Sequence, residues 1–210
     1  MNKKNYISLA NKAANLQINE LKKIKKAFNY SFIKAVDLIL NCKGKVIFAG
    51  IGKSGLIARK ISATFSSVGI PSFFCDPAQA LHGDMGQIEK RDILIVFSYS
   101  GNTSELTNML RYANRYRIKI IGVASKPDSI LLKASDIKLI LPKVKEADLT
   151  GMVPTSSTSI TLLLGDCLAT TVMHQKKFSK ENFKVFHPGG NIGKSLLLAK
   201  DIMVSGKKMP

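Results

Sequence analysis

Hydrophobic residues recur every three or four positions over the first part of the chain. Between residues 5 and 28 these positions are Ile7, Ala10, Ala14, Ile18, Leu21, Ile24 and Phe28. This spacing matches one face of an α-helix. The pattern therefore predicts one long amphipathic helix over 5–28, and a second helix follows over 31–41.

From residue 45 onward, short apolar runs alternate with segments of helical period. The runs predict strands at 45–49, 72–75, 92–97, 119–123 and 137–141. The other segments predict helices at 54–68, 104–116, 129–134, 156–175 and 180–185, whereas 186–210 is less regular. Strands that are apolar throughout and separated by helices are typical of a parallel sheet covered on both faces. We therefore expect an α/β fold, a three-layer αβα sandwich with a parallel, mainly five-stranded sheet.

The composition suits a single globular domain. The chain has 210 residues, of which 45% are hydrophobic and 22% are charged, the values of a soluble protein. No apolar run is long enough to span a membrane, and the lysine-rich N-terminus lacks an apolar signal core. Three widely spaced cysteines, each beside apolar residues, predict reduced, buried thiols in a cytoplasmic protein.

The formal net charge of +18 raises the hypothesis of a nucleic-acid partner. The lysines, however, are distributed along the whole chain, and no basic motif is interleaved with aromatic residues. A solvated lysine surface is the stronger interpretation, so we expect no nucleic-acid partner. The excess positive charge would still attract an anionic substrate.

The most informative stretch is residues 98–105, Ser-Tyr-Ser-Gly-Asn-Thr-Ser-Glu, which we call the serine loop. It joins an apolar strand to a helix, where backbone N–H groups and the helix dipole favour an anion. Its hydroxyl-rich composition exceeds what one helix cap needs. The loop has no Walker lysine and no set of Mg²⁺ ligands, so its sequence favours a phosphate monoester over a nucleoside triphosphate.

A glycine-rich loop follows the first predicted strand. Gly50, Gly52 and Gly55 have the spacing of a dinucleotide-binding fingerprint, and Asp76 lies about where the ribose-binding acid is expected. Against a dinucleotide, Pro77 follows that acid directly and Lys53 lies within the loop. The Gly-Lys-Ser tripeptide does not complete a P-loop, because residue 47 is not glycine. The sequence therefore favours a sugar phosphate over a dinucleotide, and the two loops should open onto one crevice at the carboxyl ends of the strands.

A second hydroxyl-rich helix start lies at 154–159, where Thr155, Ser156 and Ser157 follow a proline. Alone it would be a helix cap, but paired with the serine loop it suits the same phosphate or the sugar hydroxyls. Glu146 lies between a strand end and this helix start, which directs it toward the same crevice.

Three more residues are candidates for the chemistry. His82 and His187 neighbour glycines in irregular segments, where functional side chains are often displayed. A loop imidazole bonded to the backbone is the alternative for either one alone. Glu105 lies just after the serine loop, where a carboxylate also simply favours a helix N-terminus.

The motifs together resemble the sugar isomerase (SIS) domain family and, within it, the D-arabinose 5-phosphate isomerases. The matching segments are 50–55, 63–69, 71–74, 82–84, 98–101 with Glu105, 145–147, 154–158, 165–166 and 187–190. They cover almost the whole chain. Departures from the family pattern are Tyr99, Asn102 and the segment 76–79, which affect fine substrate preference.

The resemblance implies a doubly wound, flavodoxin-like SIS fold and no metal or organic cofactor. It implies interconversion of D-ribulose 5-phosphate and D-arabinose 5-phosphate through an enediol, supplying the precursor of Kdo for lipopolysaccharide or capsule. The active-site set maps onto Lys53, His82, Glu105, Glu146 and His187. The substrate-binding set is Gly52, Ser54, Ser98, Ser100 and Thr103, joined by the hydroxyls at 155–157.

The roles expected from this mapping differ between residues. Glu146 is the leading candidate for the base, and His82 and His187 for acid or ring-opening groups. Lys53 would stabilise the developing oxyanion and Glu105 would orient a partner, although base and acid could be exchanged among these residues.

The resemblance also implies a homotetramer with active sites at subunit interfaces, so that a neighbour lends His187. We assign 1–200 to the SIS domain and 201–210 to a linker or the start of a CBS module. The alternatives are an SIS isomerase acting on a hexulose or heptose phosphate, and a non-catalytic module that senses a sugar phosphate. A sensor would need the serine loop but not Lys53, two histidines and two glutamates.

Overall fold

A five-stranded parallel sheet organises the protein, which we describe from a computed structural model covering residues 4–187 and 203. The strands are β1 (Val46–Gly50), β2 (Ser72–Phe74), β3 (Ile93–Phe97), β4 (Lys119–Ala124) and β5 (Ile137–Ile140). The helices are α1 (Lys4–Leu21), α2 (Tyr30–Leu40), α3 (Lys53–Ser67), α4 (Pro77–Ala80), α5 (Leu106–Arg115), α6 (Ile130–Ala134), α7 (Ser156–Gln175) and α8 (Lys180–Phe186), with 3₁₀ turns η1 (Lys22–Ala27) and η2 (Asp84–Gln87).

The strand order is β2-β1-β3-β4-β5, and all neighbours are parallel. The chain therefore changes direction across the sheet between β1 and β3. In such a sheet the loops after these two strands diverge to opposite faces and leave a crevice at their carboxyl ends. The expected α/β architecture with a five-stranded parallel sheet is confirmed.

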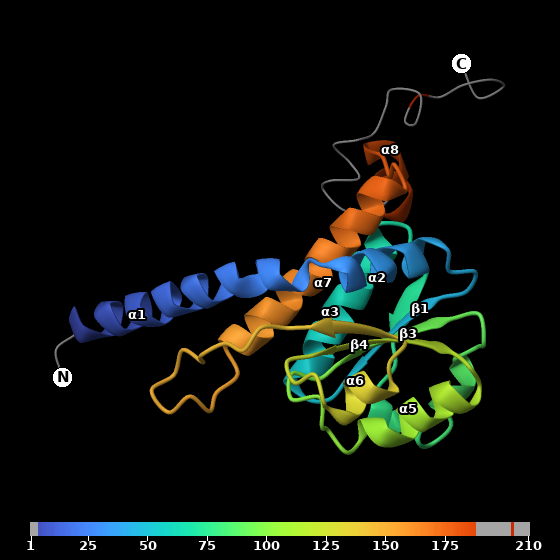
Figure 1. Cartoon of the computed structure of the whole chain (residues 1–210). Helices are drawn as coiled ribbons and strands as arrows, with labels where there is room; N and C mark the ends of the chain where they lie inside the picture. The colour runs from blue at the N-terminus through green and yellow to red at the C-terminus, as the bar shows by residue number, and fades with distance from the viewer. Residues whose placement is uncertain (1–3, 188–202, 204–210) are drawn as a thin grey trace.

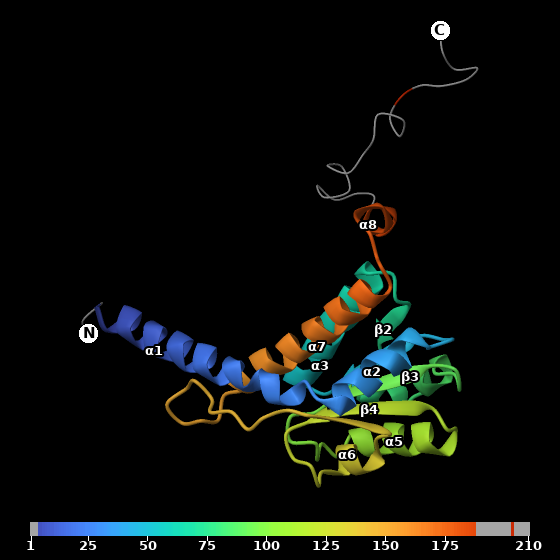
Figure 2. The same ribbon diagram turned by 45° about the horizontal axis from the view of Figure 1, so that its top comes forward.

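Alternate residues of each strand pack on opposite faces of the sheet. On β1, Phe48 belongs to the core that also contains residues of α2, α3 and α7, whereas Ile47 and Ala49 belong to the core beneath α5 and α6. Figures 1 and 2 show the same two layers, with α2, α3 and α7 on one side of the sheet and α5 and α6 on the other. Because both faces are covered, β1 and β3 are buried at every position.

The predicted helix boundaries agree closely with the structure, with two differences. The predicted helix over 5–28 is wrong in its last part, because α1 ends at Leu21 and continues as the 3₁₀ turn η1. The short helix α4 was not predicted; Asp76 caps it by accepting a hydrogen bond from the Ala78 N–H at 2.9 Å. The segment 188–202, and the predicted linker at 201–210 apart from residue 203, lie outside the described residues.

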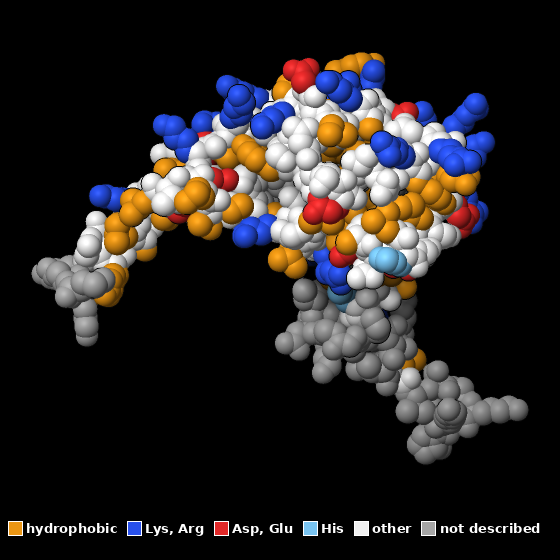
Figure 3. All heavy atoms as spheres, turned by 90° about the horizontal axis from the view of Figure 1, so that it is seen from below, with side chains coloured by type: hydrophobic (Ala, Val, Ile, Leu, Met, Phe, Trp, Pro, Cys, Tyr) orange, Lys and Arg blue, Asp and Glu red, His pale blue; other side chains and the backbone are white. Residues whose placement is uncertain are grey.

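Charged side chains are interspersed with other side chains on one face of the molecule. On the face shown in Figure 3, Lys and Arg side chains are spread between hydrophobic and uncharged ones and do not form one basic patch. Three free thiols are present; Cys75 is buried, and Cys42 and Cys167 are half-buried. Within residues 4–187 and 203, no helix combines the length and the apolar character that crossing a membrane requires.

Close packing of α7 on α3 depends on one glycine. A Cβ atom built on Gly165 of α7 would overlap Cδ1 of Ile61, which is fully buried on α3. An ion pair between Lys60 and Asp166, 2.6 Å from nitrogen to oxygen, joins the same two helices at the surface. Because α3 and α7 both begin at the crevice described below, this contact sets how their N-termini lie relative to each other.

Replacing Gly165 by Ala should therefore destabilise the fold. Overpacking typically costs about 1–3 kcal/mol, and the better helix propensity of Ala returns about 1 kcal/mol. We expect a net loss of up to about 2 kcal/mol in the free energy of unfolding, measured by urea denaturation. Ile61→Val removes the closest atom, so the cost of Gly165→Ala should be smaller in that background. An equal cost in both backgrounds would contradict this packing argument.

Candidate functional site

A cavity lies at the carboxyl ends of β1 and β3, between the starts of α3 and α7. Its volume is about 370 Å³. It is lined by Ile51, Lys53, Ser54, Ile57, Ser98, Tyr99, Ser100, Thr103, Glu146, Pro154, Ser157, Thr158 and Thr161. The glycine-rich loop, the serine loop and the second hydroxyl-rich helix start thus open onto one cavity, as predicted.

The serine loop forms one wall of the cavity and is held by its own hydroxyls. Ser98 and Thr103 share a hydrogen bond of 2.8 Å between their hydroxyl oxygens, and the Gly101 N–H donates to Ser98 Oγ at 3.1 Å. Gly101 has a φ of +69°, and a Cβ atom there would overlap the Ser129 hydroxyl. Only glycine fits both the conformation and the space. Ser100 is exposed in the cavity wall, where its hydroxyl can meet a ligand.

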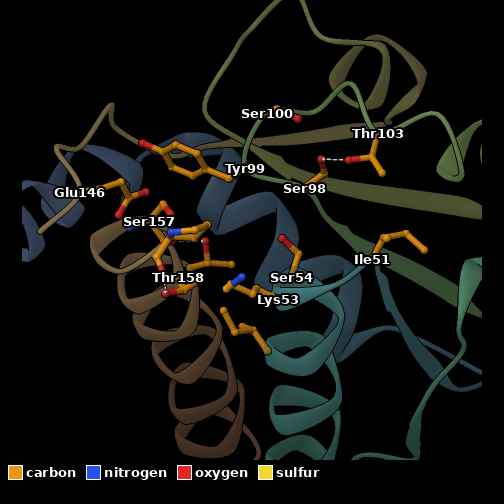
Figure 4. Close-up of a pocket in the computed structure, with 13 residues that line it drawn as sticks. Ile51, Lys53, Ser54, Ser98, Tyr99, Ser100, Thr103, Glu146, Ser157 and Thr158 are labelled. Carbon is orange, nitrogen blue, oxygen red and sulfur yellow. Dashed lines mark hydrogen bonds between the residues drawn. The ribbon is translucent and has the colours of Figure 1, made fainter. Parts of the chain in front are cut away.

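The glycine-rich loop brings Lys53 to the cavity. A Cβ atom on Gly55 would lie 2.6 Å from the Gly50 carbonyl oxygen, so these glycines allow α3 to begin directly at the end of β1. Lys53 and Ser54 are the first two residues of α3. Figure 4 shows the Lys53 side chain directed into the cavity between Ser54 and Thr158. The site therefore combines a lysine ammonium with the N-terminus of a helix, both of which attract an anion.

Glu146 lies on the opposite wall, where it binds the start of α7. Its Oε2 atom accepts hydrogen bonds from the Thr155 N–H at 2.8 Å, the Thr155 hydroxyl at 3.0 Å and the Ser157 N–H at 3.2 Å. All three bonds go to the same oxygen. The other oxygen, Oε1, accepts none of these three bonds, and Glu146 lines the cavity.

These contacts stabilise the ionised form of Glu146. Partial burial acts to raise the pKa of its carboxyl, but the hydrogen bonds from Ser157 and Thr155 together outweigh burial and hold the pKa below its ordinary value. The Glu146 side chain therefore carries a negative charge at neutral pH.

The cavity brings together five of the predicted substrate-binding residues and two of the predicted catalytic residues. Those that line it are Lys53, Ser54, Ser98, Ser100, Thr103, Glu146 and Ser157. Thr155 acts through Glu146, and its hydroxyl also accepts a hydrogen bond from the Ala147 N–H at 2.8 Å. Ser156 is fully buried behind the wall, and its hydroxyl has no hydrogen-bond partner among the described residues. Gly52 lines an adjoining hollow.

Three predicted catalytic residues lie outside the cavity of this single chain. His82 is exposed in the turn after α4, and Glu105 is exposed at the start of α5, bonded to the Ser104 hydroxyl at 2.9 Å. His187 follows α8 and stacks on Phe183 with ring centroids 3.8 Å apart. α7 has 20 residues and spans about 30 Å, and Figures 1 and 2 show α8 at the end of α7 away from its start. The roles of these three residues stay predictions.

Three residues that line the cavity were not among the predicted site residues: Tyr99, Thr158 and Thr161. Tyr99 lies inside the serine loop, and this position could have predicted that it lines the cavity. Thr161 lies one helical turn beyond Ser157, and the period of an α-helix places such a pair on the same face. Extending the hydroxyl-rich start of α7 by this period would have found Thr161.

The described residues give little support to a dinucleotide site or to a metal site. The adjoining hollow, about 320 Å³ in volume, contains the glycines of the fingerprint and Asp76. The carboxylate of Asp76, however, caps α4. Between residues 4 and 187, and at 203, no group of three or more His, Cys, Asp or Glu side chains is arranged to hold a metal ion.

Comparison with known proteins identifies the family. A model described as the SIS domain matches residues 39–171, which is more than half of the chain. The chain belongs to the SIS domain family. The resemblance inferred from the motifs is confirmed.

Named relatives are similar over most of the chain. The arabinose 5-phosphate isomerase KdsD of Escherichia coli (strain K12) is 41% identical over 191 residues, which cover 90% of this chain and 58% of that protein. The protein RP505 of Rickettsia prowazekii (strain Madrid E) is 41% identical over 210 residues, which cover 100% of this chain and 66% of that protein. The chain thus spans less than two thirds of the length of these curated relatives.

A solved structure is similar across the whole of its chain. The structure of E. coli CFT073 c3406 in complex with arabinose 5-phosphate has a TM-score of 0.86 and 34% identity, and the match covers 90% of this chain and 100% of that chain. The likeness extends beyond the sheet to most of the helices described above.

The lowered pKa of Glu146 predicts a specific dependence of stability on pH. Because folding lowers this pKa, the ionised carboxylate stabilises the fold above the ordinary value of 4.5, and this contribution is lost as the pH falls through the lowered value. We expect the free energy of unfolding of Glu146→Gln to fall less steeply below pH 4.5 than that of the wild type. Urea denaturation over a pH series measures both.

Asp128→Asn, which removes an exposed carboxylate outside the cavity, is the matched control. It should retain the wild-type steepness. Equal acid sensitivity of the wild type and Glu146→Gln would show that the bonds to Thr155 and Ser157 do not stabilise the charge.

Proposed function

We propose that this chain is an aldose–ketose isomerase that interconverts D-ribulose 5-phosphate and D-arabinose 5-phosphate. The observation that carries the proposal is the pairing, across one cavity, of an anion-binding wall with an ionised glutamate. The similarity to the KdsD isomerases and to the arabinose 5-phosphate complex supports this substrate pair. The product, D-arabinose 5-phosphate, would serve as the precursor of Kdo for lipopolysaccharide or capsule. The enzyme would act in the cytoplasm.

The phosphate end of the substrate fits the serine loop. Ser98, Ser100 and Thr103 place hydroxyl donors in one wall, and the start of α3 lies beside it. Hydroxyls and backbone N–H groups at helix starts are the donors that bind phosphate monoesters. Lys53 adds a positive charge within the same cavity.

The chemistry requires a base at the other end of the substrate. Removal of a proton from C1 of the ketose gives an enediolate, and return of the proton to C2 gives the aldose. Glu146 is the candidate base, since its anchored carboxylate leaves Oε1 free of the three bonds described above. The ammonium group of Lys53 would stabilise the negative charge that develops on the C2 oxygen.

Opening the sugar ring and delivering the proton to oxygen need further groups. His82, Glu105 and His187 are the predicted ones, and in one chain they lie outside the cavity. We propose that a homotetramer brings them to it, with a neighbouring subunit supplying His187. The exposed apolar residues Tyr6 and Ile7 of α1 support an assembly, because α1 projects from the body with hydrophobic side chains along it (Figure 3).

Turnover tests this proposal directly. Proton NMR should show that the wild type converts ribulose 5-phosphate to arabinose 5-phosphate and, in deuterated solvent, introduces deuterium at C2 of the aldose. Glu146→Gln preserves size but removes the base, so kcat should fall by roughly 10²–10⁴-fold with a much smaller change in KM. Glu181→Gln, on α8 away from the cavity, is the control and should keep wild-type turnover.

The other SIS functions predict different results in the same assay. A preference for a hexulose or heptose phosphate would replace the proposed substrate pair. Binding of pentose phosphate without any turnover would indicate a sensing module. Near-native turnover by Glu146→Gln would move the role of base to another residue, with Glu105 or His187 next in order.

A further inference from the structure

The segment that carries Glu146 is held in place by side chains from distant parts of the chain. Residues 142–147 run from the end of β5 toward α7 as irregular backbone, whose N–H and C=O groups need partners when partly buried. Three of its N–H groups, those of Val144, Lys145 and Ala147, donate to side-chain oxygens. Those oxygens belong to the serine loop, to α1 and to the start of α7, respectively.

Tyr99 makes the link to the serine loop. Its hydroxyl accepts a hydrogen bond from the Val144 N–H at 2.9 Å and donates one to the Pro142 carbonyl oxygen at 3.2 Å. Burial raises the pKa of the Tyr99 phenol, so the hydroxyl stays protonated and can donate. The carbonyl oxygen of Tyr99 is itself bound by the N–H and the hydroxyl of Ser125, both at 2.8 Å. Both ends of this residue are therefore fixed.

Glu20 makes the link to α1. It is buried, and its Oε2 atom accepts a hydrogen bond from the Lys145 N–H at 3.0 Å, directly beside Glu146 in the chain. Lys23 donates to the same oxygen at 2.5 Å, which balances the buried charge. The hydrogen bond from Lys23, together with the backbone bond from Lys145, lowers the pKa of Glu20 despite its burial. Glu20 therefore remains a charged acceptor, the kind that forms the stronger hydrogen bonds.

We propose that Tyr99 and Glu20 are positioning residues that fix the Glu146 carboxylate at a set distance from the serine loop. Tyr99 stands between Ser98 and Ser100 in sequence, and in Figure 4 its ring spans the cavity from the serine loop toward Glu146. One phenol thus connects the wall that binds the phosphate to the segment that bears the base. The inference deepens the proposed function and rests on it.

The expected consequence follows from the sensitivity of proton abstraction to distance. A misplacement of about 1 Å can cost on the order of 10²-fold in rate, even when its cause lies away from the reacting atoms. Tyr99→Phe keeps the ring against the cavity but leaves the Val144 N–H and the Pro142 carbonyl without this partner. The binding of phosphate by the serine hydroxyls should change little.

The first experiment compares Tyr99→Phe with the wild type in the isomerase assay. We expect kcat to fall roughly 10- to 100-fold. KM and the inhibition constant of inorganic phosphate should stay within about twofold of their wild-type values. Loss of a hydrogen bond to the phosphate would change them by more than this. Tyr112→Phe, which removes a phenol hydroxyl from α5 on the other face of the sheet, is the control and should leave kcat unchanged. A wild-type kcat in Tyr99→Phe, or a parallel loss of kcat and phosphate inhibition, would overturn the proposal.

The second experiment needs no turnover. Amide hydrogen exchange should be faster at Val144 in Tyr99→Phe than in the wild type, while the core strand β3 keeps its protection. Unchanged exchange at Val144 would overturn the positioning role even if the protein proved inactive. If the wild type shows no turnover but Val144 exchanges faster in Tyr99→Phe, the isomerase function is overturned. The hydrogen bond between the Val144 N–H and the Tyr99 hydroxyl is then still established.

Glu20 offers a conservative rescue. Glu20→Ala removes the acceptor for the Lys145 N–H and should lower kcat, whereas Glu20→Gln retains an oxygen and should recover most of it. Failure of the Gln variant to exceed the Ala variant in kcat, with both folded by circular dichroism, would contradict a role through this hydrogen bond.

Discussion

The hydrogen bonds between the Glu146 carboxylate and the start of α7 are the contacts on which the site depends. They place a negative charge where the helix offers unpaired N–H groups and positive potential, so a carboxylate is stable there. The same bonds turn an irregular segment toward the cavity and tie it to a helix that packs closely on α3. Helix packing, the charge of the base and the shape of the cavity are thereby linked.

The fold follows from local patterns to a large extent. β1, β3 and β4 are almost entirely apolar because both faces of the sheet are covered, so their runs are easy to recognise. The helix over 156–175 begins and ends where its period predicted. The prediction failed at Leu21, where the apolar spacing continues into η1 although the backbone changes to a 3₁₀ turn. Hydrophobic period does not distinguish these two helix types over one or two turns.

The site was predictable where it lies on strand ends and helix starts, since parallel strands bring these to one edge. Contacts between distant segments were not predictable. The hydrogen bond between Glu20 and the Lys145 N–H joins residues 125 positions apart. Its donor is a backbone group, which gives no signal in the sequence. Recognisable motifs contain His82, Glu105 and His187, yet a single chain does not bring these residues to the cavity.

We propose that one cavity holds the phosphate at the serine loop and the reacting carbons at Glu146. A crystal structure of the protein with D-arabinose 5-phosphate tests it most directly. We expect phosphate oxygens within hydrogen-bond distance of the Ser98, Ser100 or Thr103 groups, with C1 and C2 next to Glu146 Oε1. A phosphate bound elsewhere, or a sugar whose C1 and C2 lie away from Glu146, would contradict it.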